Sequence, residues 1–276
     1  MQFPLEALAA WATILGTGVS LLALFQSKEW LVLTSFLFVC VAVAAILYGR
    51  SRRLALESAS TMIEGQSIDS LNLANLRRRV NRTFVIQEAH HTAHIEGEDL
   101  HITWRYSGYC RNKHETAMDF SIDSESGTSF DELKCVAFDL GRDPDMKHEI
   151  RPLLMGTDGV SKKISVPFLE PLTINQPFKL LLRCTLPRCI TPGSGYYTST
   201  LSFDQRKVPR SEVHLIFTAP VPTWVRVYEA SRGRPATLVK SLRPSRMEPG
   251  FCEYIDVAEN RPGQSARVYI FWRDAQ

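Results

Sequence analysis

Two long runs of residues without charge near the N-terminus constrain this chain more than any other feature. Residues 5–25 carry a single charge, Glu6, near their start, and residues 30–48 carry none. Each run reaches about 20 residues, the length of a helix that crosses a hydrocarbon core of about 30 Å. The short segment between them is polar, as in a tight connection. The pattern therefore predicts a transmembrane helical hairpin over residues 1–49, with spans at 5–25 and 30–48.

A cleaved signal peptide followed by a buried helix is the alternative for the first run. Signal peptides begin with a positively charged region, and no Lys or Arg precedes residue 5. A second apolar run also follows closely, after residues 26–29. Both observations favour two membrane spans over a leader.

Aromatic and basic residues flank the second run. Trp30 and Tyr48 bracket it at the depths where amphipathic rings prefer to lie. Three arginines follow it directly: Arg50, Arg52 and Arg53. The connection between the runs offers only Lys28. Because basic residues are retained on the cytoplasmic side, we expect both termini and the following domain to be cytoplasmic, with the chain anchored in a bacterial inner membrane.

Small residues form a stripe along the first run. Ala12, Gly16 and Ser20 recur at four-residue spacing. Such stripes let helix backbones approach each other closely in lipid. The stripe serves either to pack the two spans of one chain together or to join different copies of the chain. On the second interpretation the protein is a homo-oligomer.

Residues 50–82 lack β-like alternation and contain good helix formers, so they predict a helical connector. Its charge is basic, with seven Arg against three acids over residues 49–82, a balance of +4. Four of the arginines lie near its end: Arg77, Arg78, Arg79 and Arg82. They suit contact with anionic headgroups, a bound polyanion or a solvated helix face.

From residue 83 onward the pattern changes to short alternating segments separated by turn residues. In one of them, Leu100, Ile102 and Trp104 alternate with polar neighbours, which is the period of a β-strand. Such segments recur at 100–106, 118–122, 135–139, 153–155, 164–168, 178–186, 196–203, 213–217, 224–228 and 268–272. The expected fold is therefore a membrane-anchored all-β protein: the transmembrane hairpin, the helical connector and an antiparallel β-sandwich or barrel over residues 83–276.

The six cysteines form neither a disulfide framework nor a zinc-binding pattern. Cys184 and Cys189 have no partner pair at zinc spacing, and the others stand alone in the sequence. We expect buried, reduced thiols in a cytosolic domain, and neither a metal nor another cofactor.

His90, His91 and His94 are the strongest candidates for a metal site. On a helix His90 and His94 would share a face, but the segment has a strand pattern, in which four residues span about 13 Å. No glutamate stands at the metalloprotease position between them. Three aspartates around Pro144 suit turn chemistry as well as a hard cation: Asp139, Asp143 and Asp145. Since the sequence also lacks a phosphate-binding glycine loop and a nucleophile elbow, we do not expect an enzyme.

A basic stretch over residues 205–246 is the remaining feature, with nine bases against two acids, a balance of +7. Its candidate ligand-binding residues are Arg206, Lys207, Arg210, Arg232 and Arg234. Tyr196 and Trp224 lie near them in sequence, and arginine forks beside aromatic rings suit the phosphates and bases of a small nucleotide. The same residues would also suit the inner leaflet surface, or simply lie in solvated loops.

The order of these features resembles one known class of protein. Spans at 5–25 and 30–48, the arginines that follow them and strands from Thr83 to Trp272 are similar to the two-transmembrane, β-strand-rich effectors of bacterial anti-phage systems. The resemblance covers the whole chain at the level of architecture and rests on no short motif. It implies a cytosolic β domain that senses a cyclic nucleotide, a neighbouring gene for the nucleotidyltransferase that makes it, and membrane segments that assemble in the lipid bilayer and disrupt the inner membrane.

Two functions follow from the sequence. In the first, the protein is a membrane-embedded defence effector whose β domain senses a small anionic signal and whose hairpin then oligomerises. In the second, it is a membrane-anchored adaptor whose β-sandwich recruits a protein partner. An enzyme assembled from dispersed residues is a third, less favoured, alternative.

Overall fold

The computed structural model describes residues 80–124, 128–158, 160–190, 193–231 and 234–273. Within these ranges nearly every element is a β-strand, and the single helix is a short 3-10 turn, η1 (Asp131–Leu133). A long apolar helix of membrane-spanning length does not occur among them.

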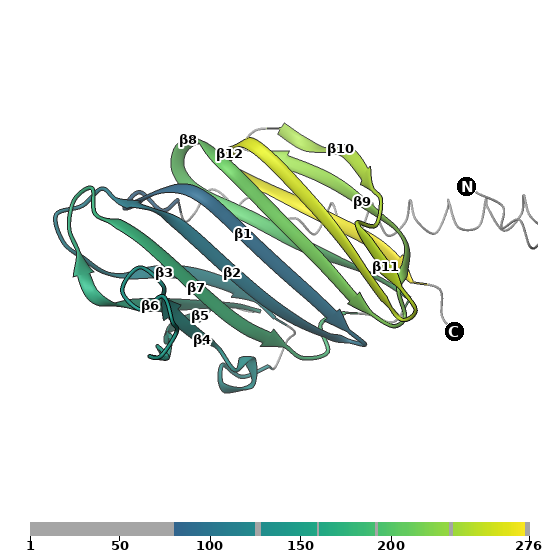
Figure 1. The fold of residues 1–276 in the computed structure, drawn as a ribbon, viewed down its shortest axis with the longest axis horizontal. Coiled ribbons are helices and arrows are strands. Elements are labelled where there is room, and N and C mark those ends of the chain that lie inside the picture. The colour runs from purple at the N-terminus through teal and green to yellow at the C-terminus, as the bar shows by residue number, and fades with distance from the viewer. Residues whose placement is uncertain (1–79, 125–127, 159, 191–192, 232–233, 274–276) are drawn as a thin grey trace, which may run out of the picture. The chain divides into compact units, whose positions relative to one another are not determined.

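Twelve strands form two sheets (Figure 1). The large sheet has the order β10-β9-β12-β8-β1-β2-β7-β4, with β11 paired to β12, and the small sheet has the order β3-β6-β5. The strands are β1 (Phe84–Glu96), β2 (Asp99–Cys110), β3 (Glu115–Asp123), β4 (Val136–Asp139), β5 (Leu153–Asp158), β6 (Ser161–Leu172), β7 (Pro177–Leu186), β8 (Ser194–Thr218), β9 (Pro222–Ser231), β10 (Arg234–Leu242), β11 (Arg246–Glu248) and β12 (Phe251–Arg273).

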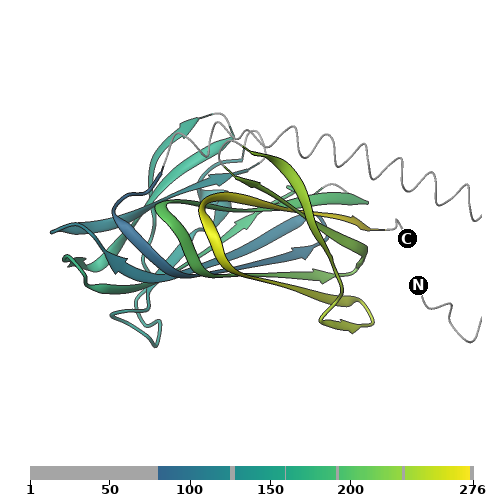
Figure 2. The same ribbon diagram turned by 90° about the horizontal axis from the view of Figure 1, so that it is seen from above.

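A ribbon of two very long antiparallel strands, β8 with 25 residues and β12 with 23, organises the large sheet. Its two halves have different neighbours. The half of β8 at Arg210–Thr218 pairs in parallel with β1, whereas the half of β12 at Ser265–Arg273 pairs with β9. The ribbon bends between these halves, as Figure 2 shows from above. One strand pair therefore belongs to two differently directed parts of the sheet.

Gly263 lies at the bend of β12. A Cβ atom there would fall 2.1 Å from the backbone oxygen of Gln205, which no side chain tolerates. The pairing register of β12 with β8 also shifts between Pro262 and Gln264. A glycine inside a strand commonly marks such a close backbone approach.

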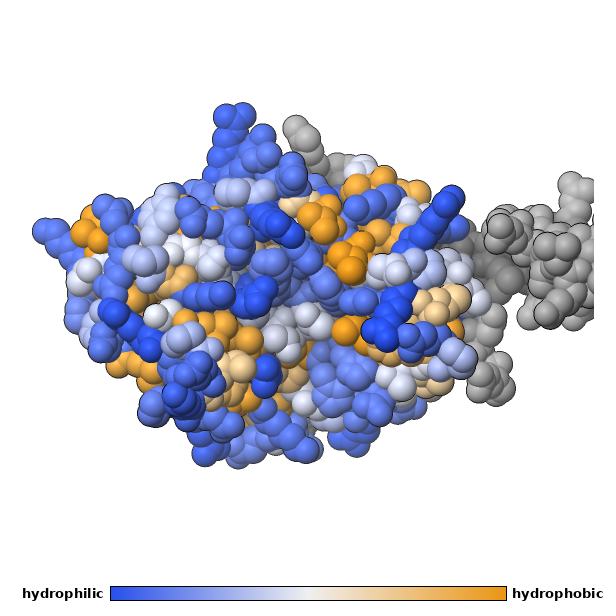
Figure 3. Space-filling view, viewed as in Figure 1, coloured by the Kyte–Doolittle hydropathy of each residue, from blue (hydrophilic) through white to orange (hydrophobic). Residues whose placement is uncertain are grey.

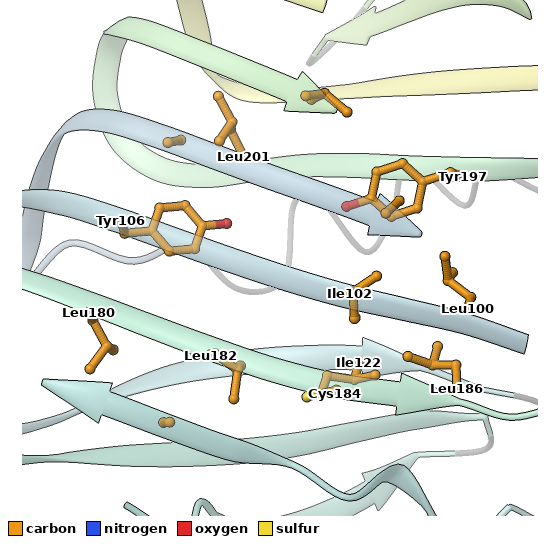
Figure 4. Close-up of a cluster of buried hydrophobic side chains, with 14 of the residues drawn as sticks. Leu100, Ile102, Tyr106, Ile122, Leu180, Leu182, Cys184, Leu186, Tyr197 and Leu201 are labelled. Atoms are coloured by element: carbon orange, nitrogen blue, oxygen red, sulfur yellow. The ribbon is translucent and has the colours of Figure 1, made fainter. Parts of the chain in front are cut away.

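Alternation along the strands builds the core. In β1, Ala89, His91, Ala93 and Ile95 are buried, while the residues that alternate with them are partly exposed. The inward side chains of β2, β7 and β8 meet those of the small sheet, and Figure 4 shows Ile122 of β3 close to this group. Phe217 and Phe271, from the two halves of the ribbon, pack edge to face with ring centroids 4.9 Å apart. The core thus joins both sheets and both halves of the bend.

The fold class expected from the sequence was wrong as a whole. The described residues contain no transmembrane hairpin and no helical connector, and the parallel pairing of β1 with β8 departs from a purely antiparallel sandwich or barrel. At the end of the expected connector, Asn81 forms a parallel bridge with Phe203 instead of a helical turn. The rest of the connector and both expected spans, 5–25 and 30–48, lie outside the described residues.

Candidate functional site

Large aromatic side chains gather on one side of the sheet formed by β8, β12 and β9. We call this group the aromatic face: Tyr196, Trp224, Arg226, Tyr228 and Trp272. The opposite side of the same three strands belongs to the main core, because Val225, Val227 and Phe271 are part of it. The aromatic face therefore points away from the core.

Strand register brings the members of the aromatic face together. Trp272 of β12 lies opposite Trp224 of β9. Two pairs along, Ile270 of β12 lies between Arg226 of β9 and Tyr196 of β8. Paired residues on neighbouring strands point to the same side with Cβ atoms about 5 Å apart. Two adjacent rows of aromatic and basic side chains result.

The aromatic face has its own small hydrophobic base. Tyr228, Val268 and Ile270 form a buried cluster apart from the main core, and Trp224 packs against it. Tyr196 is 45% exposed, so the edge of the face on β8 is open to solvent. Packing against Tyr228, Val268 and Ile270 restricts the motion of the Trp224 ring, which lowers the entropy cost of binding a ligand on it.

The chemistry of the aromatic face is that of a stacking platform with one cation. The guanidinium of Arg226 lies 5.0 Å from the centroid of the Trp224 ring, a cation–π contact. A guanidinium held against an indole presents a planar fork that matches phosphate oxygens. Exposed rings such as Tyr196 accept the flat face of a base. The arrangement suits a planar ligand that carries negative charge.

The structure brings together only part of the predicted ligand-binding set. Tyr196 and Trp224 lie on the aromatic face, but Arg206 and Lys207 are exposed near the bend of β8. Ten residues of extended strand separate Arg206 from Tyr196, about 33 Å along the chain. Arg210 lies on the other half of the ribbon, where it pairs with Glu212. The structure therefore places Arg206, Lys207 and Arg210 apart from the two aromatic residues, and the ligand-binding role of these bases stays a prediction.

The structure does not describe the side chains of two predicted ligand-binding residues, Arg232 and Arg234. The residues expected to pack or flank the membrane spans also lie outside the described residues: Ala12, Gly16, Ser20, Trp30, Tyr48, Arg50, Arg52 and Arg53.

Sequence reasoning missed Arg226 and Trp272 as site residues. Both were visible as members of alternating segments, and Arg226 is only two residues from Trp224. In a strand, residues two apart share a side, so this spacing was a usable signal for Arg226. No comparable signal existed for Trp272, because its place opposite Trp224 depends on a pairing 48 residues apart in sequence.

The histidine cluster is divided between two sides of β1. His91 points into the core and is 2% exposed, whereas His90 and His94 point outward. His90 lies 3.7 Å from Glu212, and His94 contacts Thr218 at 2.8 Å. Within the described ranges, no group of three or more His, Cys, Asp or Glu side chains is placed to hold a metal ion.

Polar side chains cover the outer side of β1, β2 and the paired half of the ribbon. His214 lies between two carboxylates, 2.7 Å from Glu212 and 3.0 Å from Glu253. The hydrogen bond with His214, and after it the one with Arg210, hold the pKa of Glu212 below its usual value. Figure 3 shows hydrophilic side chains across the middle of this side, with hydrophobic patches beside them. The charged groups largely satisfy one another.

Asp139 and Asp143 build turns. The Oδ1 atom of Asp139 accepts hydrogen bonds from the backbone N–H groups of Gly141 and Arg142, and its Oδ2 atom accepts one from Leu169. Asp143 accepts the backbone N–H of His148. The contacts with Gly141, Arg142 and His148 are local turn chemistry, in line with the simpler of the two interpretations of the aspartates, whereas the contact with Leu169 joins the turn to strand β6.

A buried polar network ties the two halves of the ribbon together. Its centre is Arg261, 2% exposed, which donates hydrogen bonds to the side chains of Ser199, Ser211 and Ser265 at 3.0–3.2 Å and to two backbone carbonyls. The network continues from Ser199 to His91, 2.9 Å, and from His91 to Tyr106, 2.8 Å: these three side chains form a chain across the core. All of its members are buried, which makes it structural.

The network also fixes the state of His91. Burial, with a smaller contribution from the charge of Arg261, lowers its pKa to about 3, so the ring is neutral at neutral pH. Because Arg261 can only donate, the hydroxyl of Ser199 accepts a hydrogen bond from it. Since the ring of His91 is neutral, one of its nitrogens donates and the other accepts in its hydrogen bonds with Ser199 and Tyr106.

Two thiols meet beside a surface cavity. The Sγ atoms of Cys135 and Cys184 are 2.8 Å apart, and both cysteines are free; Cys184 is buried and Cys135 only partly so. A cavity of about 410 Å³ opens next to Cys135, and Lys134, Glu149 and Arg151 bring charges of both signs to its wall. Mixed charge gives the cavity no clear preference for an anion or a cation.

Comparisons with known proteins add a distant likeness only. No family model matches the sequence, and no curated protein sequence matches it. Among solved structures, an M1 zinc metallopeptidase from Deinococcus radiodurans is similar, with a TM-score of 0.40 and 14% identity over 69% of this chain and 42% of that one. A two-domain variant of an M1 zinc metallopeptidase bound to L-arginine has a TM-score of 0.38 and 13% identity, over 69% and 43%. This chain spans less than half the length of either, and a likeness this distant carries no argument about activity.

Proposed function

We propose that the β domain is a binding module that senses a small anionic ligand with a planar base, a cyclic nucleotide, on its aromatic face. The observation that carries the proposal is the juxtaposition of Tyr196, Trp224 and Trp272 on three paired strands, with Arg226 stacked against one of the rings. The proposal gives the domain a binding role and not a catalytic one.

The ligand class follows from two properties of this face. Stacking on an aromatic side chain contributes about 1–3 kcal/mol per base and accepts any base. An arginine fork adds a charge-assisted contact to a phosphate. A cyclic nucleotide offers both groups at short separation, and the resemblance to anti-phage effectors agrees with this class. Membrane disruption is not part of the proposal, because residues 5–53 lie outside the described part of the chain.

The test is a binding titration of the purified full-length chain with a panel of cyclic di- and trinucleotides, followed by isothermal calorimetry. We expect one member of the panel to bind, and Trp224→Ala or Tyr196→Ala to weaken it about 5- to 150-fold, the equivalent of one lost stacking contact. Arg226→Ala should weaken it to a comparable extent.

The matched control is the double change Arg206→Ala and Lys207→Ala, which removes two exposed positive charges far from the aromatic face. We expect this control to bind like the parent. The proposal fails if no cyclic nucleotide binds, or if the control loses as much affinity as the variants of the aromatic face.

A further inference from the structure

Cys135 and Cys184 face each other across two neighbouring strands of the large sheet. Strand β4 pairs with β7 in a register that sets Val136 opposite Arg183. One residue further, the same register sets Cys135 opposite Cys184, and their Sγ atoms are 2.8 Å apart. The sheet therefore holds together two thiols that are 49 residues apart in sequence.

This pair is of the kind in which antiparallel strands approach most closely. Ala137 exchanges its backbone hydrogen bonds with Ile150, so it forms a non-hydrogen-bonded pair with Leu182 of β7. The two kinds of pair alternate along a ladder, so Cys135 and Cys184, two residues away, form a pair of the same kind with Cα atoms about 4.5 Å apart. A disulfide spans Cα distances of about 4.4–6.8 Å, so this backbone can accept one as it stands.

Solvent reaches the two thiols unequally. Cys184 is 3% exposed and belongs to the main core, on the same side of β7 as Leu182 (Figure 4). Its contact with Cys135 and its burial raise the pKa of the Cys184 thiol, which therefore stays protonated. Cys135 is only partly buried and lies in the wall of the cavity of about 410 Å³. A reagent from solvent therefore meets Cys135 first, with Cys184 in contact as the second thiol.

The cavity wall suits a small uncharged reagent. It carries two bases, Lys134 and Arg151, and two acids, Asp131 and Glu149, so its formal charges cancel. Arg151 and Asp131 also form an ion pair with each other at 2.9 Å. Such a wall gives a charged oxidant no electrostatic advantage, whereas an uncharged one such as a hydroperoxide needs none.

We propose that Cys135 and Cys184 form a redox site at which a small hydroperoxide oxidises the two thiols to a disulfide. Cys135 is the thiol that reacts with the peroxide, and Cys184 is the thiol that resolves the product. The aromatic face lies on β8, β12 and β9, and β1 and β2 separate these strands from β7. The redox site therefore does not depend on the proposed ligand.

The reaction balances in two steps. The Cys135 sulfur gives up its proton and attacks an oxygen of the hydroperoxide; an S–O bond forms, the O–O bond breaks, and water or an alcohol leaves with that proton. The Cys184 sulfur then attacks the sulfur of the Cys135 sulfenic acid; the S–S bond forms, the S–O bond breaks, and the hydroxyl leaves as water with the Cys184 proton. The two thiols lose two electrons, and the hydroperoxide gains them.

The disulfide ties one end of the large sheet in place. Strand β4 has four residues and is the last strand of the sheet, beyond β7. It follows η1, whose Leu133 is fully buried. A covalent link between β4 and β7 stabilises this end of the sheet, because a cross-link restricts the unfolded chain. The domain therefore has a reduced state and a more stable oxidised state.

Peptide mapping of the full-length chain in detergent tests the site. The reduced protein is treated with hydrogen peroxide, blocked with N-ethylmaleimide and digested without reductant. We expect a Cys135–Cys184 disulfide, with one peroxide consumed for each, at least about tenfold faster than any product at Cys189, which is also partly buried. The Tm of the oxidised chain should rise by roughly 4–16 °C and return to its first value with dithiothreitol.

Serine variants separate the roles of the two thiols. Cys184→Ser should stop at the Cys135 sulfenic acid, which dimedone traps, whereas Cys135→Ser should leave the Cys184 thiol unmodified over the same time. Cys189→Ser is the matched control and should form the disulfide at the rate of the parent.

The parent chain alone can overturn the proposal, even where a variant fails to fold. A parent that does not react, that gives sulfinic acid at Cys135 without a disulfide, or that links Cys189 instead would each do so. A Tm that oxidation leaves unchanged would refute the stabilised end of the sheet. Sulfenic acid at Cys184 in a folded Cys135→Ser chain would refute the assigned roles.

Discussion

Removal of the Arg261 side chain should destabilise the β domain strongly. Arg261→Ala takes away the donors that reach three serine hydroxyls and two backbone carbonyls inside the bend of the ribbon. The three hydroxyls and the backbone carbonyls of Ser199 and Ser265 all lose this donor. Each buried polar group left without a partner costs about 1–3 kcal/mol. Two carbonyls and the cavity left behind therefore give a loss of about 3–5 kcal/mol.

Burial of the charged Arg261 side chain also costs free energy, and removing the side chain recovers that cost. Burial lowers the pKa of Arg261, which means that its charged form is destabilised in the core, and no carboxylate is among its hydrogen-bond partners. Removing Arg261 therefore leaves no charged hydrogen-bond partner behind, and the expected loss comes from the polar groups that lose their donor and from the cavity. Arg261→Lys separates charge from geometry. An ammonium keeps the charge but lacks the planar fork, so we expect it to be nearly as destabilising as alanine.

Thermal and urea unfolding of the full-length chain, followed by near-ultraviolet circular dichroism, measures this difference. For a domain of this size, about 3–5 kcal/mol corresponds to a fall in Tm of roughly 6–20 °C. Arg246→Ala serves as control, because Arg246 and its partner Glu248 are 61% and 52% exposed, and it should shift Tm by less than about 2 °C. A lysine variant as stable as the parent, or an alanine variant within about 1 kcal/mol of it, would refute the view that the fork of Arg261 secures the bend.

Three further outcomes follow from buried groups. Burial lowers the pKa of His91 to about 3, so below about pH 6.5 the unfolded chain binds a proton at this residue that the folded chain does not bind. The free energy of unfolding should therefore fall by about 2 kcal/mol from pH 7 to pH 5. In urea unfolding, His91→Gln should abolish this part of the pH dependence. Oxidation by diamide should form a disulfide between Cys135 and Cys184. The two thiols pass two protons and two electrons to the diamide. Peptide mass spectrometry without reductant should find this disulfide in preference to others. Gly263→Ala should destabilise the domain by at least about 2 kcal/mol, whereas Gly156→Ala, which meets no atom within 4 Å, should change its unfolding midpoint little.

The strand positions were largely readable from the sequence. The predicted segment 100–106 falls within β2, and 178–186 falls within β7, because one side of each strand is buried and the other is not. The long strand β8 was predicted as two separate strands, 196–203 and 213–217. The residues between them are mostly exposed on both sides of the bend, so they show no alternation and resemble a turn. Burial patterns reveal a strand only where a core lies against it.

The candidate site was less predictable than the strands. Tyr196 and Trp224 were identified from composition, but their true neighbours come from β12, which the sequence places far away. Proximity in sequence misled the assignment of Arg206 and Lys207, since an extended chain moves about 3.3 Å per residue and soon leaves a site behind. Which strands are paired, and in what register, decides the composition of a site on a sheet. Neither property can be read from one sequence without a turn that fixes it.

The two sides of β8 connect the proposed binding face to the core. Tyr196 points to the aromatic face, while its neighbour Tyr197 is buried and accepts a hydrogen bond from Trp104 at 3.2 Å. Two residues further, Ser199 is held by Arg261. A ligand that displaced this part of β8 would have to break contacts on the inner side, and packed cores resist such continuous deformation. We therefore expect the ribbon to act as a rigid platform, and a bound ligand to leave the fold beneath it unchanged.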